Sequence, residues 1–277
     1  VSGDYAYVPD GYYGMQIIDI SAPERPQYVS ALPSGDFSAG VFIEDKYAYL
    51  ADSRAGLRII DISDARNPAV MGSIDTAGNA YGVFVQGDYA YVPDYDYGLQ
   101  IIDVSDRNNP RALSNLDTSG YARGIYIVGS YAYVADYDSG LQIIDISNPA
   151  EPELSGTCPL PGSARGVSVV GDYAYVAADK KGLQIIDVSD PAQPHVVSNF
   201  DTHGYAHDVF VKEQRAYVSD AVSGLVMIDV SDPAYPTLLG RFPVASQAMG
   251  AVLDDSGRAF IAGFIAGLYV VDVDMCR

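Results

Sequence analysis

Arginine, tyrosine and histidine recur at one position of a repeated segment, and these residue types are suited to binding an anion. The stretch GYARG places Arg123 where the related stretch GYAHD places His207, and two further copies place Arg165 and Tyr81 there. Arginine presents a planar set of donors to a carboxylate or sulfate, and a neighbouring tyrosine or histidine can exchange protons. These four residues can therefore bind an anionic ligand, or abstract the proton beside the carboxyl group of a uronate sugar.

A structural role for the same arginines is the alternative. Each arginine can pair with a nearby acid, such as Asp117, Asp136, Asp201 or Asp208. Internal ion pairs, ligand binding and catalysis all remain open for this position.

Tyrosines surround the repeated position. Tyr121 and Tyr205 stand two residues before it, and Tyr95, Tyr97 and Tyr137 lie in the polar loops DYDYG and DYDSG. The chain has no tryptophan, so these tyrosines are the expected aromatic contacts. The candidate ligand-binding residues are Tyr81, Tyr95, Tyr97, Tyr121, Arg123, Tyr137, Arg165, Tyr205 and His207. If the protein is an enzyme, the catalytic candidates are Tyr81, Arg123, Arg165 and His207.

Metal ligation has weaker sequence support. His203 and His207 are four residues apart in a turn, where they need not share a face. The DYDYG loop faintly resembles a calcium loop but lacks a closing bidentate glutamate. The aspartates that recur at the end of the YAYVAD segments are better explained as acceptors of backbone hydrogen bonds. We therefore predict no metal and no cofactor, with calcium left as the alternative.

A repeat of 42 residues positions all of these side chains. The phrase Gly-Leu-x-Ile-Ile-Asp or a close variant begins at Gly14, Gly56, Gly98, Gly140, Gly182, Gly224 and Gly267. Each repeat contains four short strand-like segments rich in Val, Ile and Tyr, separated by turns with Gly, Asp and Pro. Four strands per repeat are typical of a propeller blade. The sequence therefore predicts an all-β chain, a seven-bladed β-propeller that forms one domain over residues 1–277.

The phrases GLQIIDVSDP and YAYVADYDSG resemble the LVIVD-repeat propellers of bacteria and archaea, and the resemblance recurs in register along the chain. It implies a seven-bladed propeller that is often exported or located on the cell surface. It implies no single activity, because fold does not determine function.

Strand direction predicts which loops share a face. Because the four strands of a blade alternate in direction, the loop between strands 2 and 3 lies on the same face as the connection from strand 4 to the next blade. The candidate residues occupy these two segments, at the expected mouth of the central channel. The repeat keeps its framework while these positions differ, which is typical of a binding site placed on a rigid scaffold. Drift at exposed positions is the alternative.

Composition excludes some partners. The formal net charge is −20, with 36 acidic and 16 basic residues, so nucleic acid is an unfavourable partner. No apolar run is long enough for a membrane helix. Cys158 and Cys276 match no metal-binding or redox spacing, although a bridge between them remains open.

We therefore expect a non-catalytic, secreted, periplasmic or cell-surface scaffold that binds another protein or assembles with itself. A polysaccharide-active, lyase-like enzyme is the alternative, and carbohydrate is its expected ligand. The repeat alignment also predicts only three strands in the first blade and three in the last. We accordingly expect a fragment or processed chain, with at least about 20 preceding residues or a segment from a neighbouring chain closing the ring.

Overall fold

The computed structural model describes residues 1–254, 256–264 and 267–273. Within these residues the chain forms 26 β-strands and no α-helix, so no described segment is a helix able to cross a membrane. The chain divides into two compact units. The first comprises Val1–Ile125 and Ile146–Glu153, and the second comprises Tyr126–Asp145 and Leu154–Arg277.

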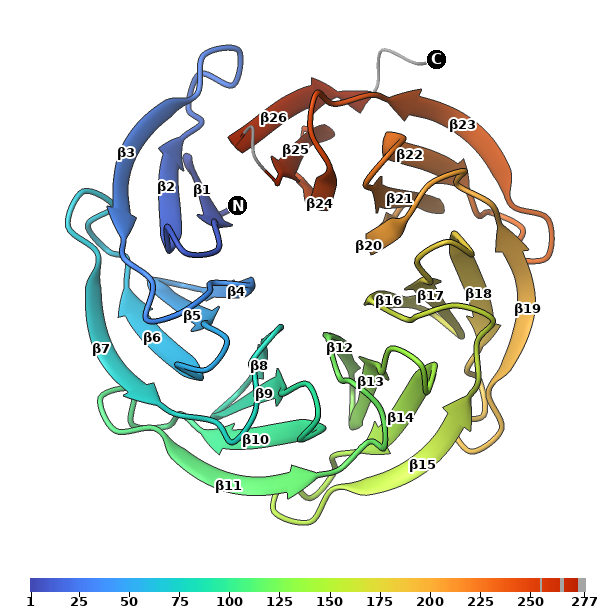
Figure 1. Cartoon of the computed structure of the whole chain (residues 1–277), viewed down its shortest axis with the longest axis horizontal. Helices are drawn as coiled ribbons and strands as arrows, with labels where there is room; N and C mark the ends of the chain where they lie inside the picture. Colours follow the sequence, from blue (N-terminus) through green and yellow to red (C-terminus); the bar gives the residue numbers. More distant parts are fainter. Residues whose placement is uncertain (255, 265–266, 274–277) are drawn as a thin grey trace. The chain divides into compact units, whose positions relative to one another are not determined.

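The first unit contains three antiparallel sheets, each a meander of strands that are consecutive in sequence (Figure 1). The first sheet has three strands: β1 (Tyr5–Pro9), β2 (Met15–Asp19) and β3 (Gln27–Leu32). The second sheet contains β4 (Gly40–Glu44), β5 (Tyr47–Ala51), β6 (Leu57–Asp61) and β7 (Ala69–Ile74). The third sheet contains β8 (Phe84–Gln86), β9 (Tyr89–Pro93), β10 (Leu99–Asp103) and β11 (Arg111–Leu116).

Four further sheets follow the same order. They are β12 (Gly124–Val128), β13 (Tyr131–Ala135), β14 (Leu141–Asp145) and β15 (Glu153–Cys158); then β16 (Gly166–Val170), β17 (Tyr173–Ala177), β18 (Leu183–Asp187) and β19 (His195–Phe200). The sixth sheet contains β20 (Ala206–Lys212), β21 (Arg215–Asp220), β22 (Gly224–Asp229) and β23 (Thr237–Phe242). The last contains β24 (Ala248–Leu253), β25 (Arg258–Gly263) and β26 (Gly267–Asp272).

Apolar residues on both faces of the middle strands explain why the sheets pack against one another. In the first unit, Tyr49 and Ile59 of one sheet join Val92 of the next in one buried cluster. In the second unit, Ile185 and Val218 join neighbouring sheets in the same way. A strand buried on both faces needs β-branched residues throughout, as the Ile-Ile-Asp phrase provides.

The aspartate that ends each Ile-Ile-Asp strand has a local structural role. Its carboxylate accepts a hydrogen bond from the backbone N–H two residues later, as Asp19 does from Ser21 at 2.9 Å and Asp187 does from Ser189 at 2.9 Å. The aspartate is the last residue of its strand, so this bond ties the end of the strand to the turn that follows.

The sequence prediction of the fold is confirmed: the protein is an all-β, seven-bladed β-propeller. Among the described residues, five sheets have four strands, and the first and the last have three. The strand count expected from the repeat alignment agrees with this arrangement.

Candidate functional site

In five repeats a short backbone pairing joins the loop between the second and third strands of the repeat to the connection that enters the next sheet. In the first unit, the Tyr95 N–H donates to the Ala122 carbonyl at 3.1 Å, and the Ala122 N–H returns a bond to Tyr95 at 2.9 Å. In the second unit, Tyr137 pairs with Ala164 and Asp179 pairs with Ala206 in the same way. We call this pairing the clip. It places both variable segments side by side, as the sequence predicts.

The clip requires an unusual backbone at its first residue. Tyr95, Tyr137 and Asp179 have φ angles of 55°, 44° and 51°, in the left-handed region that disfavours a side chain. Gly11 occupies the equivalent position of the first repeat without that penalty. Two tyrosines are thus held in a strained conformation by the paired backbone around them.

The first unit gathers four of the candidate residues into one stack. The Tyr95 and Tyr121 rings are nearly parallel, with centroids 4.4 Å apart, and the Tyr81 and Tyr95 centroids are 5.4 Å apart. The Arg123 guanidinium lies 4.6 Å from the Tyr81 ring centroid. Contacts between aromatic rings, and between a cation and the face of a ring, are favourable. The stack leaves Tyr121 40% exposed.

Tyr97 follows Tyr95 in the loop between β9 and β10 and is 47% exposed. Its backbone carbonyl accepts a hydrogen bond from the Asn115 side chain at 2.6 Å. A methyl group on Gly78 would stand 2.9 Å from the Tyr97 ring, so the absence of a side chain at Gly78 makes room for the ring. The side chain of Tyr97 is therefore positioned but retains an open surface.

The second unit places Arg165 between a tyrosine and an acid. Its guanidinium lies 5.5 Å from the Tyr137 ring centroid, and its Nε lies 3.5 Å from Asp179 Oδ1. This separation is that of an ion pair rather than of a well-formed hydrogen bond. The prediction that an arginine pairs with a nearby acid is correct for Arg165, although Asp179 is not among the four acids named from the sequence. The pairing of β16 with β17 brings the two side chains together, because the Arg165 N–H donates to the Ala177 carbonyl at 2.9 Å and Asp179 follows β17.

Lys180 is a functional candidate that the sequence analysis missed. Its Nζ lies 5.5 Å from the ring centroid of Tyr205, which is 40% exposed. The signal was visible in the sequence, because Lys180 and Lys181 are the only adjacent lysines of a strongly acidic chain.

His207 and Asp208 open strand β20, where a bulge shifts the pairing with β21 between Ala206 and Asp208. Asp208 occupies a position that is glycine in the neighbouring sheets, and a methyl group on Gly166 would stand within 2.4 Å of its carboxylate. Burial raises the pKa of Asp208 to about 6, and a hydrogen bond from the Val209 N–H opposes the shift. His203 is exposed and contacts Asp201, with 3.2 Å between Nδ1 and Oδ1.

The four catalytic candidates divide between the units. Tyr81 and Arg123 belong to the first, and Arg165 and His207 to the second. Their action as one set stays a prediction.

Buried aspartates lie beneath the clips. Asp94 accepts hydrogen bonds from Thr76 Oγ1 at 2.7 Å and from the Gly78 N–H at 2.8 Å. Both donors lie in the connection between β7 and β8. Burial, which outweighs these two bonds, raises the pKa of Asp94 to about 6, and Asp75 and Asp96 add to the shift. Asp220 also accepts bonds from its own turn, at Val222 and Ser223.

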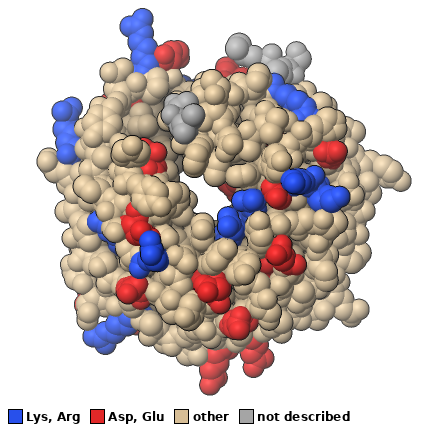
Figure 2. Space-filling view, in the orientation of Figure 1, with Lys and Arg blue, Asp and Glu red and all other residues tan. Residues whose placement is uncertain are grey.

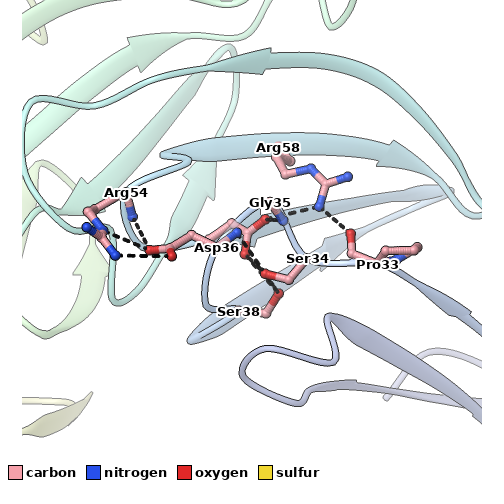
Figure 3. A network of polar contacts seen from close by, with 8 residues as sticks. Pro33, Ser34, Gly35, Asp36, Ser38, Arg54 and Arg58 are labelled. Atoms are coloured by element: carbon pink, nitrogen blue, oxygen red, sulfur yellow. Dashed lines mark hydrogen bonds and ion pairs between the residues drawn. The ribbon is translucent and has the colours of Figure 1, made fainter.

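Asp52 occupies the same position but has a cationic partner, Arg58, which Figure 3 shows together with Ser34, Gly35 and Ser38. Arg58 Nη1 lies 3.0 Å from its carboxylate, and the Gly35 N–H donates to it at 2.6 Å. Burial alone would raise the pKa of Asp52, but these bonds and those from Ser34 and Ser38 hold it below its usual value.

No group of three metal-binding side chains is found among the described residues. Cys158 is a buried free thiol, and Cys276 lies outside the described residues. On the face drawn in Figure 2, uncharged residues form most of the surface, and acidic and basic side chains are interspersed.

Repeated antiparallel sheets of four strands are the blades of a β-propeller, and in this protein the loops at one edge of the sheets vary. The LVIVD repeat family matches residues 1–31, 37–76, 77–118, 119–159, 161–202 and 203–244. Because these matches cover most of the sequence, the chain belongs to the LVIVD repeat family. No curated protein matches the sequence.

Several solved propellers share the fold. The β-propeller domain of Cps50 (Swd1) from Myceliophteria thermophila gives a TM-score of 0.76 at 12% identity, covering 98% of this chain and 93% of that one. The WD40 propeller domain of Doa1 gives 0.78 at 8% identity, covering 96% and 88%. The computationally designed Ika8 protein gives 0.74 at 8% identity, covering 99% and 82%. At such identities the likeness shows the fold alone.

Proposed function

We propose that this protein is a non-catalytic scaffold that binds another protein, or further copies of itself, through its clipped loops. One observation carries the proposal. The clip keeps the same backbone pairing from repeat to repeat, while its first residue changes from Tyr95 and Tyr137 to Asp179. A constant framework that presents different side chains supports recognition rather than packing.

The chemistry of the exposed residues supports a protein partner. Tyr97, Tyr121 and Tyr205 each expose roughly two-fifths or more of their surface on these segments. Tyrosine combines a rigid ring with a hydroxyl, and it is enriched where proteins contact one another. We also propose that the protein is secreted, periplasmic or on the cell surface, which rests on the family resemblance alone.

Affinity capture tests the proposal. The wild-type protein and a variant with Tyr97, Lys180 and Tyr205 replaced by Ser are immobilised and exposed to extracellular and envelope fractions of the source organism. We expect a partner that the wild type retains and the variant loses. Equal retention by both proteins contradicts binding through the clipped loops.

A polysaccharide-active, lyase-like enzyme is the second candidate. It is favoured by the placement of Arg123 over Tyr81 and of Arg165 over Tyr137, which puts a cation beside a phenol in each unit. A lyase generates an unsaturated uronate, which absorbs ultraviolet light. The scaffold proposal predicts no such absorbance with any acidic polysaccharide. Absorbance that disappears in folded R165A or H207A variants would favour the enzyme instead.

A further inference from the structure

Five side chains of the second unit form a continuous line across three neighbouring sheets. We call it the cationic strip: Tyr137, Arg165, Asp179, Lys180 and Tyr205. Arg165 lies over the Tyr137 ring and contacts Asp179, and the adjacent Lys180 lies over the Tyr205 ring. A ring-and-cation pair therefore lies at each end of the line, with Asp179 between the two cations.

The clips fix the spacing of the strip. Tyr137 is paired with Ala164 beside Arg165, and Asp179 is paired with Ala206 beside Tyr205. Both pairs of hydrogen bonds have lengths of 2.9–3.1 Å. Equivalent positions on packed sheets are about 10 Å apart, which is the scale of a disaccharide. The strip thus presents ring-and-cation pairs at intervals suited to a linear chain of sugars.

Lys180 of the strip and the adjacent Lys181 are notable in a molecule with a net charge of −20. Lys180 and Lys181 are exposed, and neither contacts a carboxylate in the part of the chain that the structure describes. The equivalent loop of the first unit has Asp96 and Tyr97 at these two positions, on the same clipped backbone. The change therefore replaces an acidic loop by a basic one without altering its framework.

We propose that the cationic strip binds a linear polysaccharide whose sugar rings carry carboxylates. Lys180 and Lys181 pair with the carboxylates, and the exposed surface of Tyr205 packs against the C–H groups of a sugar ring. Asp179 offsets part of the charge of Arg165, so the two lysines supply most of the attraction. This inference rests on the proposed role of the clipped loops in binding, and it adds a polysaccharide ligand to the proposed protein partner. An acidic peptide would use the lysines but would have no need of Tyr205.

Isothermal titration with polygalacturonate tests the proposal on the whole protein. We expect the wild type to bind, with an affinity that falls as salt is raised because the lysine–carboxylate contacts are exposed. The K180A/K181A variant should bind about tenfold more weakly or worse, since it loses both charges. The Y205A variant should also bind several-fold more weakly.

Two controls test whether binding depends on Lys180 and Lys181 and on the sugar rings of the ligand. Lys46 is an exposed lysine 5.3 Å from the Tyr47 ring centroid, which reproduces the Lys180 contact at the turn between β4 and β5. K46A should therefore bind like the wild type. Polyglutamate carries carboxylates without sugar rings, and we expect it to bind more weakly than polygalacturonate.

Three results would overturn the proposal. They are no binding of polygalacturonate, equal loss of binding in K46A, and polyglutamate binding as tight as that of polygalacturonate and insensitive to Y205A. The last result would indicate an acidic protein as the ligand. A protein partner retained in the capture experiment, without polygalacturonate binding, would reject this ligand while the scaffold function stands.

Discussion

The buried aspartates show how one residue type acquires different electrostatics at equivalent positions. Asp52 and Asp94 are both fully buried, yet only Asp52 has an arginine within hydrogen-bonding distance. The cause is a single substitution in the Gly-Leu-x-Ile-Ile-Asp phrase, where Arg58 stands in place of the glutamine found at Gln100. A buried carboxylate disfavours its charged form unless it is paired.

Replacing Arg58 should therefore destabilise the protein. R58Q restores the residue common at this position but leaves the Asp52 carboxylate without its cation, so we expect a loss of about 2–3 kcal/mol at pH 7. The loss should shrink in acid, where the unpaired carboxylate takes up a proton. Urea unfolding measures both effects. The control is R54A, because Arg54 pairs with Asp36 on the surface and should change stability by no more than about 0.5 kcal/mol. Equal effects of the two substitutions would contradict this account.

The raised pKa of Asp94 predicts that its contribution to the stability of the wild-type protein is greatest in acid. Its pKa is about 6 in the folded protein and 3.8 in the reference state, so the folded state binds the proton more tightly. The contribution of Asp94 to the free energy of unfolding is thus fully present below about pH 4. This contribution falls by up to about 3 kcal/mol as the pH rises to about 6. D94N removes the titration. The difference in unfolding free energy between wild type and D94N should change by this amount from pH 4 to pH 7. A difference that is constant with pH would show that Asp94 is not protonated on folding.

At the scale of the strands and loops, the glycine that opens the Gly-Leu-x-Ile-Ile-Asp phrase closes the loop that carries the clip, as Gly98 does through backbone hydrogen bonds with Asp94 and Tyr95. Gly98 has a φ of 72°, and a methyl group there would stand 2.3 Å from the Leu116 carbonyl oxygen. Gly87, in the turn between β8 and β9, has a similar φ of 62° but open space around it. The two residues therefore separate backbone preference from close packing.

We expect G98A to cost about 3 kcal/mol or more, because both the left-handed backbone and the steric overlap disfavour alanine. G87A should cost about 1 kcal/mol, since only the backbone preference is lost. Thermal or urea unfolding of the two variants provides the comparison. If the free energy of unfolding decreases by the same amount in both variants, the close packing of Gly98 against Leu116 does not stabilise the loop.

At the scale of the whole molecule, the sequence predicted the fold well because the same phrases recur in every repeat. Each Gly-Leu-x-Ile-Ile-Asp phrase became the third strand of its repeat, and the 42-residue spacing predicted the order of the sheets. The strand count also followed, because Val1 and Ser2 align with only the end of an inner strand.

Side-chain partners were less predictable. Arg165 contacts Asp179, which is 14 residues further along the chain, because the β16–β17 hairpin places the residues before β16 beside those after β17. The clip between Asp179 and Ala206 brings Lys180 to Tyr205, across two repeats. Spacing in sequence does not report which side chains meet across a hairpin or between two repeats, so only the common face of these loops could be predicted.

The central claim is that the repeat provides stability while the exposed side chains of the clipped loops provide binding. The most direct test is the free energy of urea unfolding of the variant with Tyr97, Lys180 and Tyr205 replaced by Ser, the same variant that is used in affinity capture. The account predicts a value within about 1 kcal/mol of the wild type, because all three residues are exposed and none belongs to the buried core. A loss of several kcal/mol would contradict it, since these residues would then belong to the packed framework.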